Sequence, residues 1–165
     1  SVFNRARLIK NSKNRIPYGV NLIQKHKRES WIVFTENKKQ ANEFNKIINT
    51  KGFKSALYNT DLDSAERLEN LNRFKKADLN VLVTCTALDE GFDMPEADGA
   101  LILSASSSKR QRVQRMGRVL RITENKPNAL IVTVYSSKTE FDKLMEEAKR
   151  YHKEGVPVSW KRQDR

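Results

Sequence analysis

Cysteine, histidine and long apolar runs are scarce in this chain of 165 residues. Its single cysteine, Cys85, cannot form an intramolecular disulfide and lies inside an apolar run, which is typical of a buried structural thiol in an intracellular protein. The two histidines, His26 and His152, are far apart and complete neither a hydrolase triad nor a Cys/His zinc site. No apolar run approaches the roughly 18 residues of a transmembrane helix, and the basic first segment lacks the apolar core of a secretory signal. These absences predict a cytoplasmic protein, or a nuclear one in a eukaryote, without metal ligands of its own.

A phosphate-binding loop is also absent, because the chain contains no Gly-Lys-Ser or Gly-Lys-Thr sequence. The stretch LDEGF (88–92) superficially looks like an acidic box that holds magnesium. It does not directly end an apolar strand, however, and no phosphate-binding loop precedes it. The chain alone is therefore expected neither to hydrolyse ATP nor to bind it tightly.

Positive charge is abundant and unevenly placed. The formal net charge is +12, of which residues 1–30 contribute +7 and residues 104–126 contribute +6. The rest of the chain is nearly neutral. Localised positive potential attracts phosphate, so two basic patches indicate a polyanionic partner. A solvated basic surface is the alternative.

Five short apolar runs predict buried strands. They are continuous rather than alternating, as is typical of central parallel strands covered on both faces. The predicted strands span 31–35, 55–58, 81–84, 100–103 and 129–134.

Helical patterns separate most of these runs. The predicted helices span 37–51, 63–76, 108–122 and 139–152, and a helical N-terminal segment, interrupted near Pro17 and Gly19, precedes the first strand. Strands that alternate with helices predict an α/β three-layer sandwich, with a mostly parallel central sheet and helices on both faces. Ligands of such sheets bind at the carboxyl ends of the strands. Here that edge should carry loops 35–37, 84–99 and 104–110.

The stretch VQRMGRVLR (113–121) contains three evenly spaced arginines. In a helix, steps of three residues place Arg115, Arg118 and Arg121 along one flank. Each planar guanidinium can pair with two phosphate oxygens at once. A solvated charged face would usually include acids for i,i+4 pairing, and 108–122 contains none. The pattern therefore favours phosphate contacts.

A second candidate site follows the strand at 81–84. Thr84 ends this strand, Gly91 permits close approach of a backbone, and Asp93 follows two residues later. A hydroxyl and a glycine amide at the carboxyl end of a strand can hold a phosphate, while a carboxylate can accept from a ribose hydroxyl. An ordinary polar crossover loop is the alternative.

Together these segments resemble the second RecA-like domain of superfamily 2 helicases, over about residues 29–150. WIVFT (31–35) is similar to motif IV, VLVTCTALDEGFDMPEAD (81–98) to motif V and QRVQRMGRVLR (111–121) to motif VI. The resemblance implies a RecA-like three-layer sandwich.

Within the superfamily the sequence looks most like XPB-like repair helicases, UvrB and the motor subunits of type I and III restriction enzymes. It has Glu90-Gly91 where DEAD-box proteins usually have Arg-Gly, and Val119-Leu120 where they usually have x-Gly. Tyr58-Asn59 stands where many relatives have His-Gly, and no contact is carried over to that position.

The resemblance implies roles in ATP hydrolysis for motif VI. Arg118 and Arg121 match the arginine fingers that reach the γ-phosphate of ATP, which is bound with Mg²⁺ mainly by the first RecA-like domain. Gln114 and Arg115 match positions that face the nucleotide or couple the two domains.

The resemblance also implies roles for residues of motif V and motif IV. Gly91 and Asp93 match positions near the nucleotide. Thr84 matches the threonine that touches the nucleic-acid backbone, and Thr35 is a weaker candidate for the same contact.

The implied protein is an ATP-dependent DNA helicase or translocase, of which this chain is the C-terminal motor domain. We expect residues 1–28 to form a basic helical linker, 29–152 the RecA-like domain and 153–165 a polar, frayed tail, with the first RecA-like domain upstream. One alternative is a freestanding basic module that binds nucleic acid without ATPase activity. Another is a degenerate domain kept for protein contacts.

Overall fold

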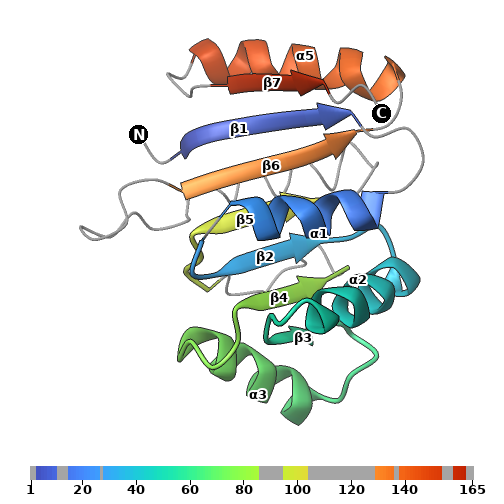
Figure 1. The fold of residues 1–165 in the computed structure, drawn as a ribbon, viewed down its shortest axis with the longest axis vertical. Helices are drawn as coiled ribbons and strands as arrows, with labels where there is room; N and C mark the ends of the chain where they lie inside the picture. The colour runs from blue at the N-terminus through green and yellow to red at the C-terminus, as the bar shows by residue number, and fades with distance from the viewer. Residues whose placement is uncertain are drawn as a thin grey trace.

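Seven strands form one sheet in the computed structural model, which describes residues 3–10, 15–26, 28–85, 95–103, 129–135, 138–153 and 158–162 (Figure 1). Their spatial order is β3-β4-β2-β5-β6-β1-β7, and each pairing is parallel. The strands are β1 (Phe3–Lys10), β2 (Trp31–Phe34), β3 (Ser55–Leu57), β4 (Val81–Thr84), β5 (Gly99–Ile102), β6 (Ala129–Tyr135) and β7 (Val158–Arg162). The described helices are α1 (Arg15–Lys25), α2 (Lys38–Thr50), α3 (Ser64–Lys75) and α5 (Lys138–Lys153).

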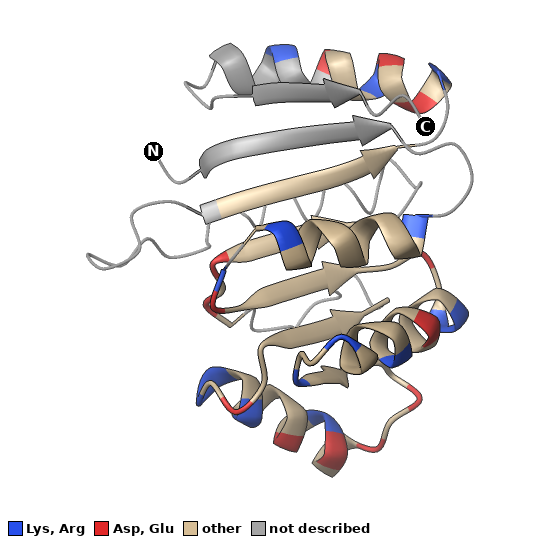
Figure 2. Ribbon diagram, viewed as in Figure 1, with Lys and Arg blue, Asp and Glu red and all other residues tan. Residues whose placement is uncertain are grey.

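Successive side chains of the central strands enter two different apolar layers, because a strand points alternate residues to opposite faces. Val33 packs in the layer that contains Phe44 of α2 and the apolar side of α1. Ile32 packs in the layer that contains Phe74 of α3. Helices therefore cover both faces of a parallel sheet, which confirms the predicted three-layer α/β sandwich. Figure 2 shows the charges on helices and turns, whereas β2, β4 and β5 carry none.

The five predicted strands and the predicted helices at 37–51, 63–76 and 139–152 differ from the observed ones by at most one residue at each end. Gly52 has a φ of 88° just beyond α2, as expected of a glycine that ends a helix. Asp63 caps α3 by accepting a hydrogen bond from the Glu66 amide at 2.8 Å. The predicted helix over 108–122 lies outside the described residues.

The expected helical segment before the strand at 31–35 is present as α1, but the expected interruption near Pro17 and Gly19 is wrong, and so is the expectation that no strand precedes it. Residues 3–10 form β1, which pairs with β6 on one side and β7 on the other. Helix α1 then continues through both supposed breaks. Pro17 lies in its first turn, where amides have no partner within the helix. At Gly19 a Cβ would lie 2.9 Å from Leu101 Cδ2, so the missing side chain allows the helix to approach the sheet.

The expectation of a frayed C-terminal tail differs from the structure as well. Residues 158–162 form β7, an edge strand parallel to β1. Elements near both ends of the chain thus join the central sheet, since β1 finds partners far away in sequence. The division into 1–28, 29–152 and 153–165 stays a prediction. None of the described helices is long and apolar enough to cross a membrane.

Candidate functional site

The carboxyl ends of the parallel strands all lie at one edge of the sheet. Of the loops expected there, 35–37 is described, 84–99 is described in part and 104–110 lies outside the described residues. The chain leaves this edge toward its undescribed candidate segments at Cys85, after β4, and at Leu103, after β5. Because β2 separates β4 from β5, these two points are about 10 Å apart at strand spacing.

Thr35 and Thr84, the two candidate nucleic-acid contacts, lie side by side at this edge. The Thr35 amide donates to the Thr84 carbonyl oxygen at 2.9 Å. The Thr35 hydroxyl lies 3.2 Å from the same oxygen and 3.3 Å from the Asn37 carbonyl oxygen, so its one proton is directed to the main chain. Both side chains are buried. Their contact with nucleic acid stays a prediction.

Asn59 was given no role from the sequence, and the structure places it at the same edge. Its Oδ1 accepts a hydrogen bond from the Cys85 amide at 3.0 Å. The residue is fully buried, and Nδ2 has no hydrogen-bond partner within the described part of the chain. The only signal in the sequence is a polar residue directly after the apolar run at 55–58.

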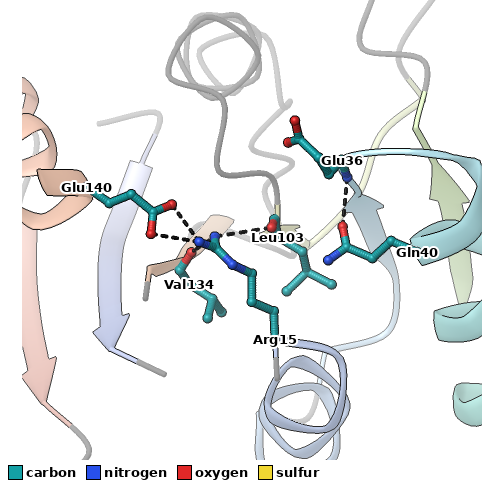
Figure 3. A network of polar contacts seen from close by, with 6 residues as sticks. All are labelled: Arg15, Glu36, Gln40, Leu103, Val134 and Glu140. Atoms are coloured by element: carbon teal, nitrogen blue, oxygen red, sulfur yellow. Dashed lines mark hydrogen bonds and ion pairs between the residues drawn. The ribbon is translucent and has the colours of Figure 1, made fainter. Parts of the chain in front are cut away.

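The turn between β2 and α2 is held by reciprocal hydrogen bonds. Asn37 caps α2, and its side chain accepts from the Gln40 amide at 2.9 Å. Gln40 Oε1 in turn accepts from the Glu36 amide at 2.7 Å (Figure 3). This arrangement resembles a capping box, in which two otherwise unpaired amides at the helix start find partners. The turn after Thr35 therefore has a defined shape.

Arg15, at the start of α1, joins three elements at the carboxyl edge (Figure 3). Its Nη2 donates to both Glu140 carboxylate oxygens of α5, at 2.6 and 2.7 Å. Its Nη1 lies 2.9 Å from the Val134 carbonyl oxygen in β6 and 3.3 Å from that of Leu103. The sequence counted Arg15 only as part of a basic patch, because Glu140 is 125 residues away. Arg15 thus has a structural role, because it connects these elements.

The residues expected to contact the nucleotide lie outside the described residues. They are Gly91, Asp93, Gln114, Arg115, Arg118 and Arg121. The second basic patch, 104–126, also falls there. The roles of these residues stay predictions.

Few groups with unusual chemistry occur in the described part of the chain. No cluster of His, Cys, Asp and Glu there could hold a metal ion, so none of these residues is assigned to Mg²⁺. Burial raises the pKa of Tyr18, which packs against the apolar layer beside α1. Its hydroxyl therefore stays neutral at physiological pH.

Residues 14–123 match the helicase conserved C-terminal domain. The chain is 34% identical over 129 residues to the DNA 3'-5' translocase XPB2 of Sulfurisphaera tokodaii, which covers 78% of the chain and 28% of that protein. It is 30% identical over 125 residues to the UvrABC system protein B of Fusobacterium nucleatum, covering 72% of the chain and 19% of that protein. An ATP-dependent rRNA helicase, RRP3 of Scheffersomyces stipitis, is 25% identical over 72% of the chain and 24% of its own length. The chain thus spans less than a third of the length of these curated relatives.

Solved structures with the same fold include the C-terminal domain of the DEAD-box protein Dbp5 from S. cerevisiae. That domain superposes with a TM-score of 0.77 at 19% identity, over 100% of this chain and 92% of the other. The E. coli DEAD-box protein SrmB gives a TM-score of 0.70 at 15% identity, over 99% of this chain and 92% of the other. These likenesses show the RecA-like α/β fold.

Proposed function

Since the chain belongs to the family of helicase conserved C-terminal domains, we propose that it is the C-terminal motor domain of an ATP-dependent DNA helicase or translocase. The observation that carries this proposal is the match over residues 14–123, which includes the segments that resemble motifs IV, V and VI. The likeness to a DNA translocase at 34% identity supports DNA as the polyanion. The site of action would be the cytoplasm, or the nucleus in a eukaryote.

In this function Arg118 and Arg121 act as arginine fingers. Negative charge builds on the γ-phosphoryl oxygens in the transition state, and a guanidinium from across an interdomain cleft stabilises it by roughly 10³–10⁵-fold in rate. ATP and Mg²⁺ would be held mainly by a separate N-terminal RecA-like domain, because this sequence has no phosphate-binding loop. Gln114, Arg115, Gly91 and Asp93 would line the nucleotide from this side.

Nucleic acid would be gripped through its backbone at the carboxyl edge. Thr84, with Thr35 beside it, is the candidate contact. Backbone contacts carry no base readout, so we expect little sequence specificity. Closing and opening of the cleft during each ATP cycle would change this grip and so move the strand.

The decisive experiment replaces Arg118 by alanine in the natural protein that carries this chain. We expect kcat for ATP hydrolysis to fall by about 10³-fold or more, because a finger acts on the transition state, while nucleic-acid affinity is largely kept. Arg73→Ala, which removes an exposed arginine from the last turn of α3, is the matched control and should leave both quantities unchanged.

A proportional loss of ATPase activity and nucleic-acid binding in Arg118→Ala would show that Arg118 is a binding residue instead. The alternative, a basic nucleic-acid-binding module without ATPase activity, is favoured by the net charge of +12. It predicts binding that is independent of ATP. Each phosphate contact on a single strand would then add about −0.7 to the slope of log affinity against log salt.

A further inference from the structure

The peptide group that joins Thr84 to Cys85 is held at both of its polar atoms. Its carbonyl oxygen accepts from the Thr35 amide at 2.9 Å and lies 3.2 Å from the Thr35 hydroxyl. Its N–H donates to Asn59 Oδ1 at 3.0 Å. Thr35 follows β2 and Asn59 follows β3, the two neighbours of β4 in the sheet. We call these contacts the peptide bracket.

The peptide bracket fixes how the chain leaves β4. A peptide group is planar, so restraining its N–H and C=O from opposite sides removes its freedom to rotate. The residues that follow, 86–94, include Gly91 and Asp93, the candidate nucleotide contacts in motif V. The orientation of this peptide sets the direction in which the chain leaves β4 toward that segment.

Asn59 contributes to the peptide bracket through its side-chain oxygen. Oδ1 satisfies the Cys85 amide, whereas Nδ2 is buried with no partner among the described residues. An unpaired buried donor is unfavourable. A residue that served only to fill space would avoid this cost by being apolar, so the side chain is best explained by the hydrogen bond that it accepts.

We propose that Thr35 and Asn59 are positioning residues that orient motif V through the Thr84–Cys85 peptide. Thr35 then acts through the main chain of Thr84, in addition to any contact of its own. The proposal rests on the proposed function, because motif V needs this orientation only if it serves a nucleotide or a nucleic-acid strand.

The first measurement is amide hydrogen exchange in the full chain. Asn59→Leu removes the acceptor at similar volume, and we expect exchange at the Cys85 amide to accelerate about tenfold, as for one lost hydrogen bond. Thr35→Val should have a smaller effect, because the Thr35 amide still donates. Thr35→Ser keeps the hydroxyl and should therefore retain protection at Cys85.

Leu71→Ala is the control for a general loss of stability. Leu71 is buried in the apolar layer between α3 and the sheet, and its side chain makes none of the hydrogen bonds of the peptide bracket. The proposal is overturned if Asn59→Leu and Thr35→Val accelerate exchange at Cys85 no more than Leu71→Ala does at equal overall stability. The single cysteine gives a second probe, since the labelling rate of its thiol should change with the orientation of this peptide.

The second measurement is nucleic-acid-stimulated ATP hydrolysis by the natural protein. We expect Asn59→Leu to lower kcat about tenfold and Thr35→Val to lower it less, while KM for ATP changes little, and we expect Thr35→Ser to keep the wild-type kcat. Faster exchange at Cys85 with unchanged kcat would mean that the peptide is held without serving the site, which overturns the proposal. A wild-type protein without ATPase activity would instead refute the proposed function, and the exchange data would still show whether the peptide is held.

Discussion

At the amino edge of the sheet, hydrogen bonds join the turn before β2 to the turn before β5, whereas at the carboxyl edge the side chains of two residues, Arg15 and Asn59, bond to main-chain groups at the ends of strands. The Glu29 amide donates to Asp98 Oδ2 at 3.1 Å, and the Asp98 amide lies 3.1 Å from Ser30 Oγ. At the other edge, Arg15 and Asn59 reach main-chain groups of other elements.

The difference separates the part of the molecule that maintains the fold from the part that shapes the site. Contacts at the amino edge join the turns that lead directly into β2 and β5. Contacts at the carboxyl edge fix the points at which Cys85 and Leu103 lead into the candidate motif segments. Substitutions at the amino edge should therefore lower stability, and those at the carboxyl edge should also alter site geometry.

The largest effect on stability is expected at the amino edge, from Gly99→Ala. The new Cβ would lie 2.6 Å from Trp31 Cε3, and two further ring atoms are within 2.8 Å. Trp31 is fully buried and cannot move aside. We expect the free energy of unfolding to fall by about 3 kcal/mol, as measured by urea denaturation.

Gly52→Ala is the matched control for this substitution. A Cβ at Gly52 meets nothing within 4 Å, and only its φ of 88° is unfavourable, at about 1–2 kcal/mol. If Gly99→Ala lowered the free energy of unfolding no more than Gly52→Ala does, the close packing at the amino edge would not be important for the fold.

A smaller loss is expected at the carboxyl edge from Arg15→Met, which removes the ion pair between Arg15 and Glu140. Both side chains are less than 15% exposed, so the loss should be about 2 kcal/mol and should change little with salt. A double-mutant cycle with Glu140→Gln should show coupling of about 1 kcal/mol. Coupling near zero would mean that Arg15 acts only through the carbonyl groups of Leu103 and Val134. Arg73→Met, at an exposed position of α3, is the control.

The sequence predicted the elements that depend on local signals but not those that depend on distant contacts. Local signals were sufficient for the central strands and for α2 and α3, because continuous apolar runs and the residues Gly52 and Asp63 act within their own segments. β1 could not be predicted, since its strand conformation depends on pairing with β6, more than 100 residues away. For the same reason the sequence gave no indication of the Arg15–Glu140 pair.

The candidate site, like the fold, could be predicted only in part from the sequence. The edge of the sheet follows from the parallel topology that the apolar runs indicate, whereas the proximity of Thr35 and Thr84 depends on the pairing of β2 with β4, which these runs do not specify. Asn59 was missed because its function depends on which strand lies beside β3, which local patterns do not specify. The phosphate contacts of the motif VI arginines remain a prediction from their spacing, and their role as arginine fingers remains a prediction from the resemblance.

The smallest effect is expected from Asn37→Ala, which removes the cap of α2 and should cost about 1 kcal/mol. Asp63→Ala removes the cap of α3 and should cost a similar amount. In Asn37→Ala we expect faster amide exchange at Gln40, which loses its acceptor, but not at Thr35, whose amide bonds to Thr84 in the next strand. If Thr35 exchanged faster as well, the cap and the strand ends would form one cooperative unit. The carboxyl edge would then respond as a whole to changes in the turn, and its hydrogen bonds could not be assigned separate roles in stability and in shaping the site.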